Sequence, residues 1–208
     1  MRTIKAFTLA EALITLMIIG VISAITIPTI KKISDEHTYV TAAKKAYETV
    51  SLATKKIKSK EGPVKLWVGS ENIMGGLFEK EMNAKLTGNN DNAKKHEVVQ
   101  LNGESAGDFF FDMEILDGSL WYFEDYSKNC NLSDSDLYYN ACAVIKVDTN
   151  GKNDPNMVGL DVLGFYIKSD GTVLPFGSGD SASTASCTKD GTGWGCSTKI
   201  IMEGKISW

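Results

Sequence analysis

Histidine is scarce in this chain of 208 residues, with only His37 and His96, and cysteine is limited to four positions. A Ser or Cys triad needs a histidine base, and zinc sites are usually built from closely spaced Cys and His. No two cysteines have C-x-x-C spacing, and the motifs G-x-S-x-G, H-E-x-x-H and G-x-x-x-x-G-K-[ST] are missing. The sequence therefore predicts neither an enzyme nor a protein that requires a cofactor.

An excess of positive charge is also missing. The formal net charge is −4 and the sequence pI is about 5.3. A nucleic-acid binder normally carries a basic footprint, so no nucleic-acid partner is implied for the chain as a whole. The length suits one extracytoplasmic head of ordinary domain size plus one further element.

The first strong signal is an apolar run near the N-terminus. Residues 7–27 read FTLAEALITLMIIGVISAITI and contain a single charge. At ~1.5 Å per helical residue, such a helix spans about 30 Å, the thickness of a bilayer's hydrocarbon core. Arg2 and Lys5 precede the run and favour a cytoplasmic N-terminus. The sequence predicts one membrane-spanning helix, with the rest of the chain outside.

The single charge in that run is Glu11. A carboxylate at membrane depth costs about 3 kcal/mol on insertion scales, whereas each Leu, Ile, Val or Phe returns about 0.3–0.6 kcal/mol. Eleven such residues lie in the run, so insertion is still expected. Were the chain cut between Ala6 and Phe7, the new α-amino group of a neighbouring copy could pair with Glu11. That pairing predicts an assembly role for the carboxylate.

These residues carry a family resemblance that covers positions 1–30. The segment FTLAEALITLMIIGVISAITIP resembles the prepilin cleavage and methylation motif of type IV pilins and type II secretion pseudopilins. The resemblance implies a leader of residues 1–6, removed by a prepilin peptidase between Ala6 and Phe7, and N-methylation of Phe7. It makes Glu11 the fifth residue of the mature chain. Ala6 stands where the family most often has Gly, and a small residue at this position is expected to slow cleavage without abolishing it.

Two further positions match the same motif. Gly20 and Pro28 fall where pilin helices carry a glycine and a proline. Both residue types weaken a helix locally, which lets it bend or melt when subunits pack. The family then implies a filament-core helix over residues 7–28 and an extracytoplasmic head over residues 29–208.

Other interpretations of the N-terminus remain open. A secretory signal peptide cut after Ala24 would release a soluble chain starting at Ile25, but Glu11 argues against that hypothesis. A plain membrane tether explains the helix without explaining Glu11 or the short leader. A buried core helix rarely needs so long an apolar run.

Cysteine usage agrees with export. Four cysteines in an exported chain favour disulfides formed in an oxidising compartment, with buried free thiols as the alternative. Nearness in sequence suggests two pairs, Cys130 with Cys142 and Cys187 with Cys196. A disulfide-bounded C-terminal region is also found in the family.

Beyond Pro28, helical periodicity continues to about residue 60, where Gly62 and Pro63 end it. A short helix is expected from about Met74, and a polar surface loop over residues 87–95. Asp-Gly turns at 117–118 and 170–171 separate β-prone runs, and CAVIKVD lies between these hairpins. We expect about five strands, mostly antiparallel. The predicted fold is α+β, a long N-terminal helix packed against a C-terminal antiparallel sheet.

One segment of the head suggests a cation site. In VDTNGKNDPN, oxygen-bearing side chains alternate, which in a tight loop suits calcium. The candidate ligands are Asp148, Asn150, Asp154 and Asp161. Asx-Gly-Pro clusters also form metal-free turns, and the acid that closes an EF-hand is missing. Major pseudopilins are known for a calcium loop in the head, and this segment is similar in kind.

The expected function is that of a structural subunit of a type IV pilus-like or type II secretion pseudopilus filament. Its expected partners are other copies or other pilins, the prepilin peptidase, assembly-platform proteins and the bacterial inner membrane. The chain would cross that membrane once and later enter a periplasmic or cell-surface filament. Two alternatives remain: a minor pilin that binds DNA, a surface or a substrate, and a tethered binding module that does not polymerise.

Overall fold

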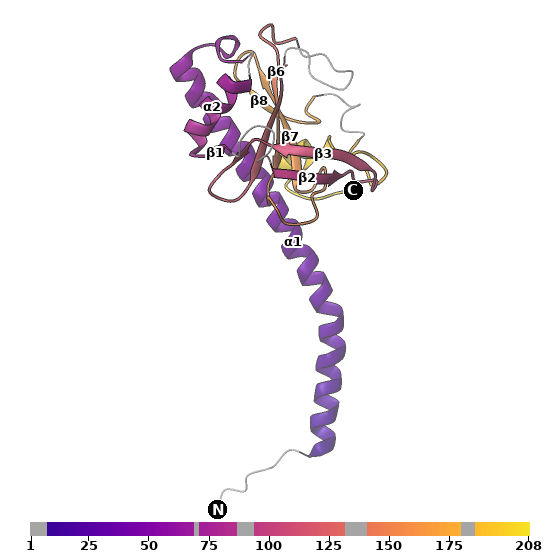
Figure 1. Cartoon of the computed structure of the whole chain (residues 1–208). Helices are drawn as coiled ribbons and strands as arrows, with labels where there is room; N and C mark the ends of the chain where they lie inside the picture. Colours follow the sequence, from indigo (N-terminus) through magenta and orange to yellow (C-terminus); the bar gives the residue numbers. More distant parts are fainter. Residues whose placement is uncertain (1–7, 69–70, 87–93, 132–140, 180–185) are drawn as a thin grey trace, which may run out of the picture. The chain divides into compact units, whose positions relative to one another are not determined.

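The computed structural model describes residues 8–68, 71–86, 94–131, 141–179 and 186–208. They fall into two compact units, residues 1–38 and 39–208. Helix α1, Leu9–Glu61, contributes to both units. The fold is α+β, as predicted, with a long apolar N-terminal helix and an antiparallel sheet in the C-terminal part of the chain (Figure 1).

In the first unit, α1 exposes apolar side chains on all sides. Its most apolar 18-residue stretch has a mean hydropathy of 2.3, and none of that stretch is buried. By length and composition, α1 can cross a membrane. The helix is continuous through Gly20 and Pro28.

In the second unit, α1 becomes amphipathic. Its buried positions recur at helical spacing: Val40, Ala43, Ala46, Val50, Ala53, Thr54 and Ile57. The helix ends where expected, because Gly62 adopts a left-handed φ of 84° and donates its N–H to the Lys58 carbonyl at 3.0 Å. Pro63 follows and cannot continue the helix.

The remaining elements follow in chain order. They are η1 (Val64–Leu66), α2 (Glu71–Met82), β1 (Lys85–Leu86), β2 (Lys94–Val99), β3 (Ser105–Phe111), β4 (Met113–Glu114), β5 (Leu120–Tyr126), β6 (Ala141–Asp148), β7 (Val162–Lys168), β8 (Val173–Pro175) and α4 (Cys196–Glu203). Six strands form one sheet in the order β1-β4-β5-β6-β7-β8, and β2 pairs with β3 in a second sheet. Within the described residues, each pair of neighbouring strands in these two sheets is antiparallel.

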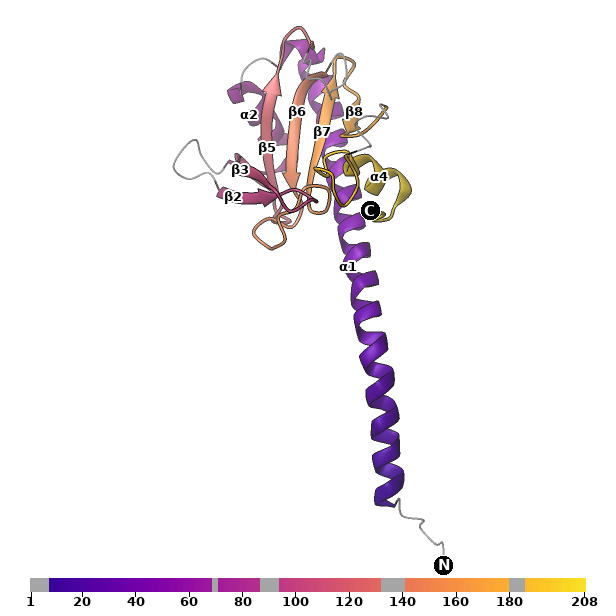
Figure 2. The same cartoon turned by 90° about the vertical axis from the view of Figure 1, so that its right-hand side faces the viewer.

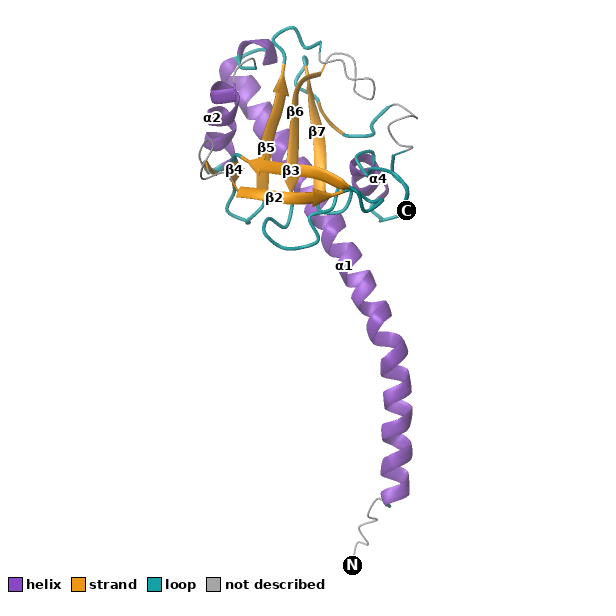
Figure 3. Cartoon of the chain, turned by 45° about the vertical axis from the view of Figure 1, so that its right-hand side comes forward, coloured by secondary structure: helices purple, strands orange, loops and turns teal. Residues whose placement is uncertain are grey.

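The six-stranded sheet is covered on both faces. Residues 39–61 of α1, together with α2, pack against one face, where Trp121, Phe123 and Phe165 are buried. The β2–β3 hairpin crosses the opposite face, as Figure 3 shows. It buries Phe109 and Phe111 there. Because β6 lies between two covered faces, its side chains are almost continuously apolar.

Several predicted elements are confirmed. The Asp117–Gly118 turn joins β4 to β5, and the Asp170–Gly171 turn joins β7 to β8. Strand β6 lies between β5 and β7, side by side in Figure 2.

Other predictions were wrong. The described residues form eight strands rather than about five. The β-prone run that precedes the Asp117–Gly118 turn, FFFDMEIL, is not one strand, because it divides between β3 in the small sheet and β4 in the large one. Residues 94–95 open β2 and are not loop, whereas 87–93 lie outside the described residues. Helix α2 begins at Glu71, earlier than expected, and α4 was not predicted. Short elements are decided by the partners they pair with, which local propensity does not reveal.

Candidate functional site

The N-terminal site begins at Thr8, immediately before α1. The main-chain N–H and hydroxyl of Thr8 donate to Glu11 Oε2 at 2.9 and 2.8 Å, and the Glu11 N–H donates to Thr8 Oγ1 at 3.2 Å. This reciprocal arrangement is a capping box, which satisfies two N–H groups at the start of a helix. Glu11 is exposed and is the one acidic residue in the first turn of α1.

Ala6 and Phe7, which flank the predicted cleavage site, lie outside the described residues. Gly20 and Pro28 lie within α1. At Gly20, an added Cβ would meet no heavy atom within 4 Å. This surface of the helix is therefore open to close approach by another chain.

In the second unit, the β6–β7 connection gathers acidic groups. Asp148 ends β6, Asp161 immediately precedes β7, and both side chains are completely buried. Asp148 Oδ1 accepts the N–H groups of Asn150 at 3.2 Å and Gly151 at 2.9 Å. Gly151 has a φ of 68°, and a Cβ there would lie 2.2 Å from the Gly118 carbonyl oxygen, so the turn requires glycine.

Asp161 organises the far side of the same loop. Its carboxylate accepts N–H groups from Met157 at 2.6 Å and Asn156 at 3.0 Å. It also accepts from Asn150 Nδ2 at 2.9 Å. Three donors to one carboxylate fix the path of residues 148–161.

The two carboxyl groups are electrostatically unfavourable neighbours. Burial, and then the charge of Asp161, raises the pKa of Asp148 from 3.8 to about 8, against the N–H donors of Asn150 and Gly151 that lower it. Burial also raises the pKa of Asp161, although its hydrogen bonds act in the opposite direction. A proton or a cation therefore stabilises this pair.

The predicted calcium ligands only partly converge. Asp148, Asn150 and Asp161 meet within the loop, whereas the side chain of Asp154 is exposed and only its main-chain carbonyl accepts from Asn150 Nδ2, at 3.3 Å. Asn150 Oδ1 is buried and has no hydrogen-bond partner in the part of the chain that the structure describes. Two carboxylates and a spare amide oxygen are hard ligands of the kind calcium prefers.

Sequence reasoning missed His96. This residue lies on β2, and its Nδ1 is 3.6 Å from Asp148 Oδ2. Its ring also stands edge-on to Phe111, with centroids 5.6 Å apart. No local motif joins positions 96 and 148, because only the docking of the β2–β3 hairpin brings them together.

The disulfides are the pairs expected from nearness in sequence, Cys130–Cys142 and Cys187–Cys196. Trp194 lies beside the second bridge. Its ring packs 6.0 Å from Phe109 and 5.7 Å from Phe176, and Lys146 Nζ lies 4.9 Å from it. Trp194 and Trp208 are both partly buried and pack against the core.

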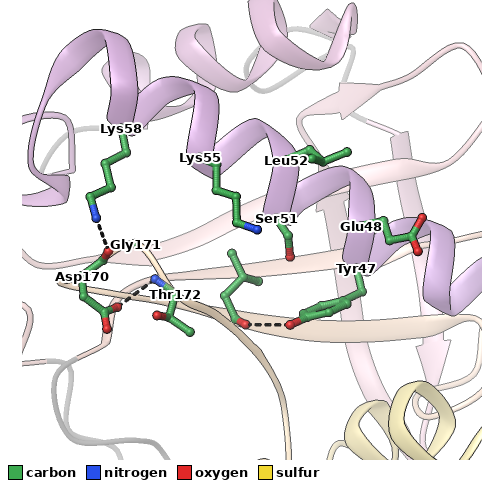
Figure 4. A pocket seen from close by; sticks show the side chains of 10 residues that line it. Tyr47, Glu48, Ser51, Leu52, Lys55, Lys58, Asp170, Gly171 and Thr172 are labelled. Atoms are coloured by element: carbon green, nitrogen blue, oxygen red, sulfur yellow. Dashed lines mark hydrogen bonds between the residues drawn. The ribbon is translucent and has the colours of Figure 1, made fainter.

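A groove of about 570 Å³ runs between α1 and the β7–β8 turn (Figure 4). Tyr47 donates its hydroxyl to the Val173 carbonyl at 3.3 Å, and Lys58 donates to the Asp170 carbonyl at 2.6 Å. Between these two contacts, Lys55 and Ser51 line the groove. The lining holds two lysines, the acidic residues Glu48 and Asp170, hydroxyl groups and apolar surface.

Comparisons with protein-family models, with curated proteins and with solved structures found no match for this chain. Function is therefore inferred from the chain's own residues.

Proposed function

We propose that this chain is a structural subunit of an extracytoplasmic, pilin-like filament. The observation that carries the proposal is the first part of α1, which is apolar on all sides and has one carboxylate, Glu11, in its first turn. Such a helix needs either lipid or a bundle of like helices around it.

The proposed sequence of events begins in the bacterial inner membrane, with the N-terminus cytoplasmic and the head outside. A prepilin peptidase removes residues 1–6, and the α-amino group of Phe7 is methylated. The freed terminus of one copy then meets Glu11 of its neighbour, so the cost of a charge in an apolar bundle is offset by pairing. Assembly-platform proteins lift subunits from the membrane into a pilus or a secretion pseudopilus.

The capping box supports this role for Glu11. In the single chain, Thr8 holds the Glu11 carboxylate at the very start of α1, adjacent to the terminus that cleavage would create. A carboxylate held by a neutral hydroxyl and one N–H can exchange these donors for a cationic partner, because charge-assisted hydrogen bonds are stronger.

The test is Glu11→Ala in the native host. We expect at least tenfold fewer filaments, since each subunit would bury an unpaired terminal ammonium in the bundle. Glu61→Ala, which removes an exposed carboxylate at the last residue of α1, is the matched control and should leave filament yield unchanged. If Glu11→Ala assembles as well as the control, the filament proposal is wrong, and a tethered binding module becomes the better hypothesis.

The proposal also includes a calcium ion bound in the head. Asp148, Asn150 and Asp161 would hold it, and its charge would neutralise the buried acid pair. The ion would fix the β6–β7 connection; assembly would still depend on α1.

A further inference from the structure

Two loops that lie apart in the sequence meet in the second unit. The first, the acid loop, is residues 148–161 and carries the two completely buried aspartates. The second, the bridged loop, is residues 186–196 and is closed by the Cys187–Cys196 disulfide. The two loops touch through main-chain atoms at two glycines.

At this contact the two backbones approach too closely for a side chain to fit between them. A Cβ on Gly159 would lie 2.6 Å from the Gly193 carbonyl oxygen and 3.1 Å from Cys196 Sγ. A Cβ on Gly193 would lie 2.4 Å from the Val158 carbonyl oxygen. Both glycines also have a left-handed φ, 81° and 88°, which other residues adopt only with strain. The bridged loop therefore rests directly on the acid loop, with the disulfide at the point of contact.

The same stretch of the acid loop is also hydrogen-bonded to β2. The Val99 N–H donates to the Asn156 carbonyl at 3.0 Å, and the Val158 N–H donates to the Val99 carbonyl at 2.8 Å. Val158 is completely buried. Residues 156–159 are thus held by two neighbours, β2 and the bridged loop.

This stretch supplies donors to the buried carboxylate of Asp161. The N–H groups of Asn156 and Met157 donate to that carboxylate at 3.0 and 2.6 Å. A buried carboxylate depends on such donors, because burial without hydrogen bonds is costly. Movement of residues 156–159 would therefore remove two donors from Asp161.

The disulfide fixes the bridged loop in the shape that makes this contact. The Ser186 carbonyl accepts the Gly193 N–H at 2.9 Å, and the Ser186 hydroxyl accepts the Gly195 N–H at 2.8 Å. Cys187 follows Ser186 in the chain and Cys196 follows Gly195, so the covalent link closes the same loop as these hydrogen bonds. Without that link, closing the loop costs additional conformational entropy.

We propose that the bridged loop and residues 156–161 open and close as one unit, so that formation of the Cys187–Cys196 disulfide controls how firmly Asp161 is held. The disulfide forms by thiol–disulfide exchange, in which the two thiols pass two electrons and two protons to the disulfide form of a thiol oxidoreductase and leave it as a dithiol. A reduced chain holds its buried acid pair less firmly than an oxidised one. The inference concerns the second unit alone and is independent of filament assembly.

Coupling between two sites is reciprocal, so a change at Asp161 must alter the opening of the bridged loop. Reduction of the full chain in detergent micelles, without divalent cations, tests this effect. Cys187 and Cys196 are both buried, so dithiothreitol reaches their disulfide only when the loop opens. Asp161→Ala should raise the rate of reduction of this disulfide about tenfold. Mass spectrometry of alkylated peptides follows each disulfide separately.

The second disulfide, Cys130–Cys142, is the internal control and should be reduced at an unchanged rate. Asp170→Ala is the control variant, because it also removes a carboxylate that accepts a main-chain N–H, from Thr172 at 2.8 Å, but lies in the turn at the other end of β7. It should change neither rate. An unchanged rate for Cys187–Cys196 in Asp161→Ala would overturn the proposal. Equal acceleration of both disulfides would overturn it as well, because the second unit would then open as a whole.

Amide hydrogen exchange tests the coupling in the other direction. Gly193→Ala keeps the disulfide but places a Cβ against the Val158 carbonyl oxygen. It should speed exchange at the Asn156 and Met157 amides about tenfold, because the contact that holds them is displaced.

Gly62→Ala is the control for backbone strain. Gly62 also has a left-handed φ, 84°, but a Cβ there would meet only the Leu66 side chain, at an ordinary 3.5 Å. This variant should leave exchange at residues 156–157 unchanged. The proposal is wrong if the two variants exchange equally at these amides, or if Gly193→Ala speeds exchange as much in the central strand β6.

Discussion

Asp148 and Asp161 show how a residue's environment changes its chemistry. Both occur in a polar, turn-rich segment, yet both are completely buried, with His96 as the other titratable group beside Asp148. A raised carboxyl pKa means that the folded chain binds a proton more tightly than the unfolded chain does. The resulting stabilisation is fully present below the unfolded pKa and is lost as pH rises through the folded pKa.

The pH dependence of stability follows from that shift. With the pKa of Asp148 raised from 3.8 to about 8, the Tm of the full chain in detergent micelles, without divalent cations, should fall as pH rises from about 4 to about 8 and level off above that value. Asp148→Asn keeps an acceptor for Asn150 and Gly151 but does not titrate. If the Tm of Asp148→Asn falls as steeply with pH as that of the unsubstituted chain, Asp148 is not responsible for the pH dependence.

Calcium should act on the same residues. If the loop binds the ion, adding a chelator to the purified protein at pH 7.5 should lower its Tm, because a ligand that binds only the folded state stabilises it. Asp161→Asn should abolish the chelator effect. A Tm that neither chelator nor added calcium changes would show that the loop does not bind calcium. The turn would then be stabilised by a proton.

At the scale of elements, the C-terminal region depends on one bridge. Cys187–Cys196 joins a Ser- and Thr-rich segment to the first residue of α4, and Ser197 in that helix accepts the Gly164 N–H of β7 at 3.1 Å. The bridge therefore helps to hold α4 on the sheet.

Replacing both cysteines tests that role. The double variant Cys187→Ser and Cys196→Ser should lose about 2–3 kcal/mol of unfolding free energy, the chain-entropy value for a short loop. Chemical denaturation of the oxidised protein and of the variant gives the difference. A change below about 0.5 kcal/mol, the usual scatter for surface substitutions, would mean that packing alone orders the region.

Helix α1 is one element with two environments. Its first part lacks a polar face, and its second part has the buried stripe of a helix that packs on a sheet. The change occurs without a break in the helix.

At the scale of the whole molecule, the proposed filament function predicts that residues 1–6 are removed before assembly. Intact-mass spectrometry of protein from native membranes should find a chain that starts at a methylated Phe7. Ala6→Gly restores the family's usual residue and should increase the mature fraction. A chain that starts at Ile25 indicates signal-peptide cleavage, and one that retains Met1 indicates a simple tether; either result contradicts the proposal.

The sequence by itself determined the features that depend on residues close to one another in the chain. The apolar run, its single Glu11, the end of α1 at Gly62 and the two Asp-Gly hairpins follow from residue type and spacing. Disulfide partners close in sequence were also predictable, because a short loop is easily closed.

Only the tertiary structure decided the rest. The division of FFFDMEIL between two sheets, the approach of His96 to Asp148 and the groove beside Lys55 all join segments far apart in the chain. Burial of Asp148 likewise depends on a hairpin that local patterning did not reveal. Strand partners and burial are set by long-range packing, and a single sequence records residue type at each position but not which positions meet.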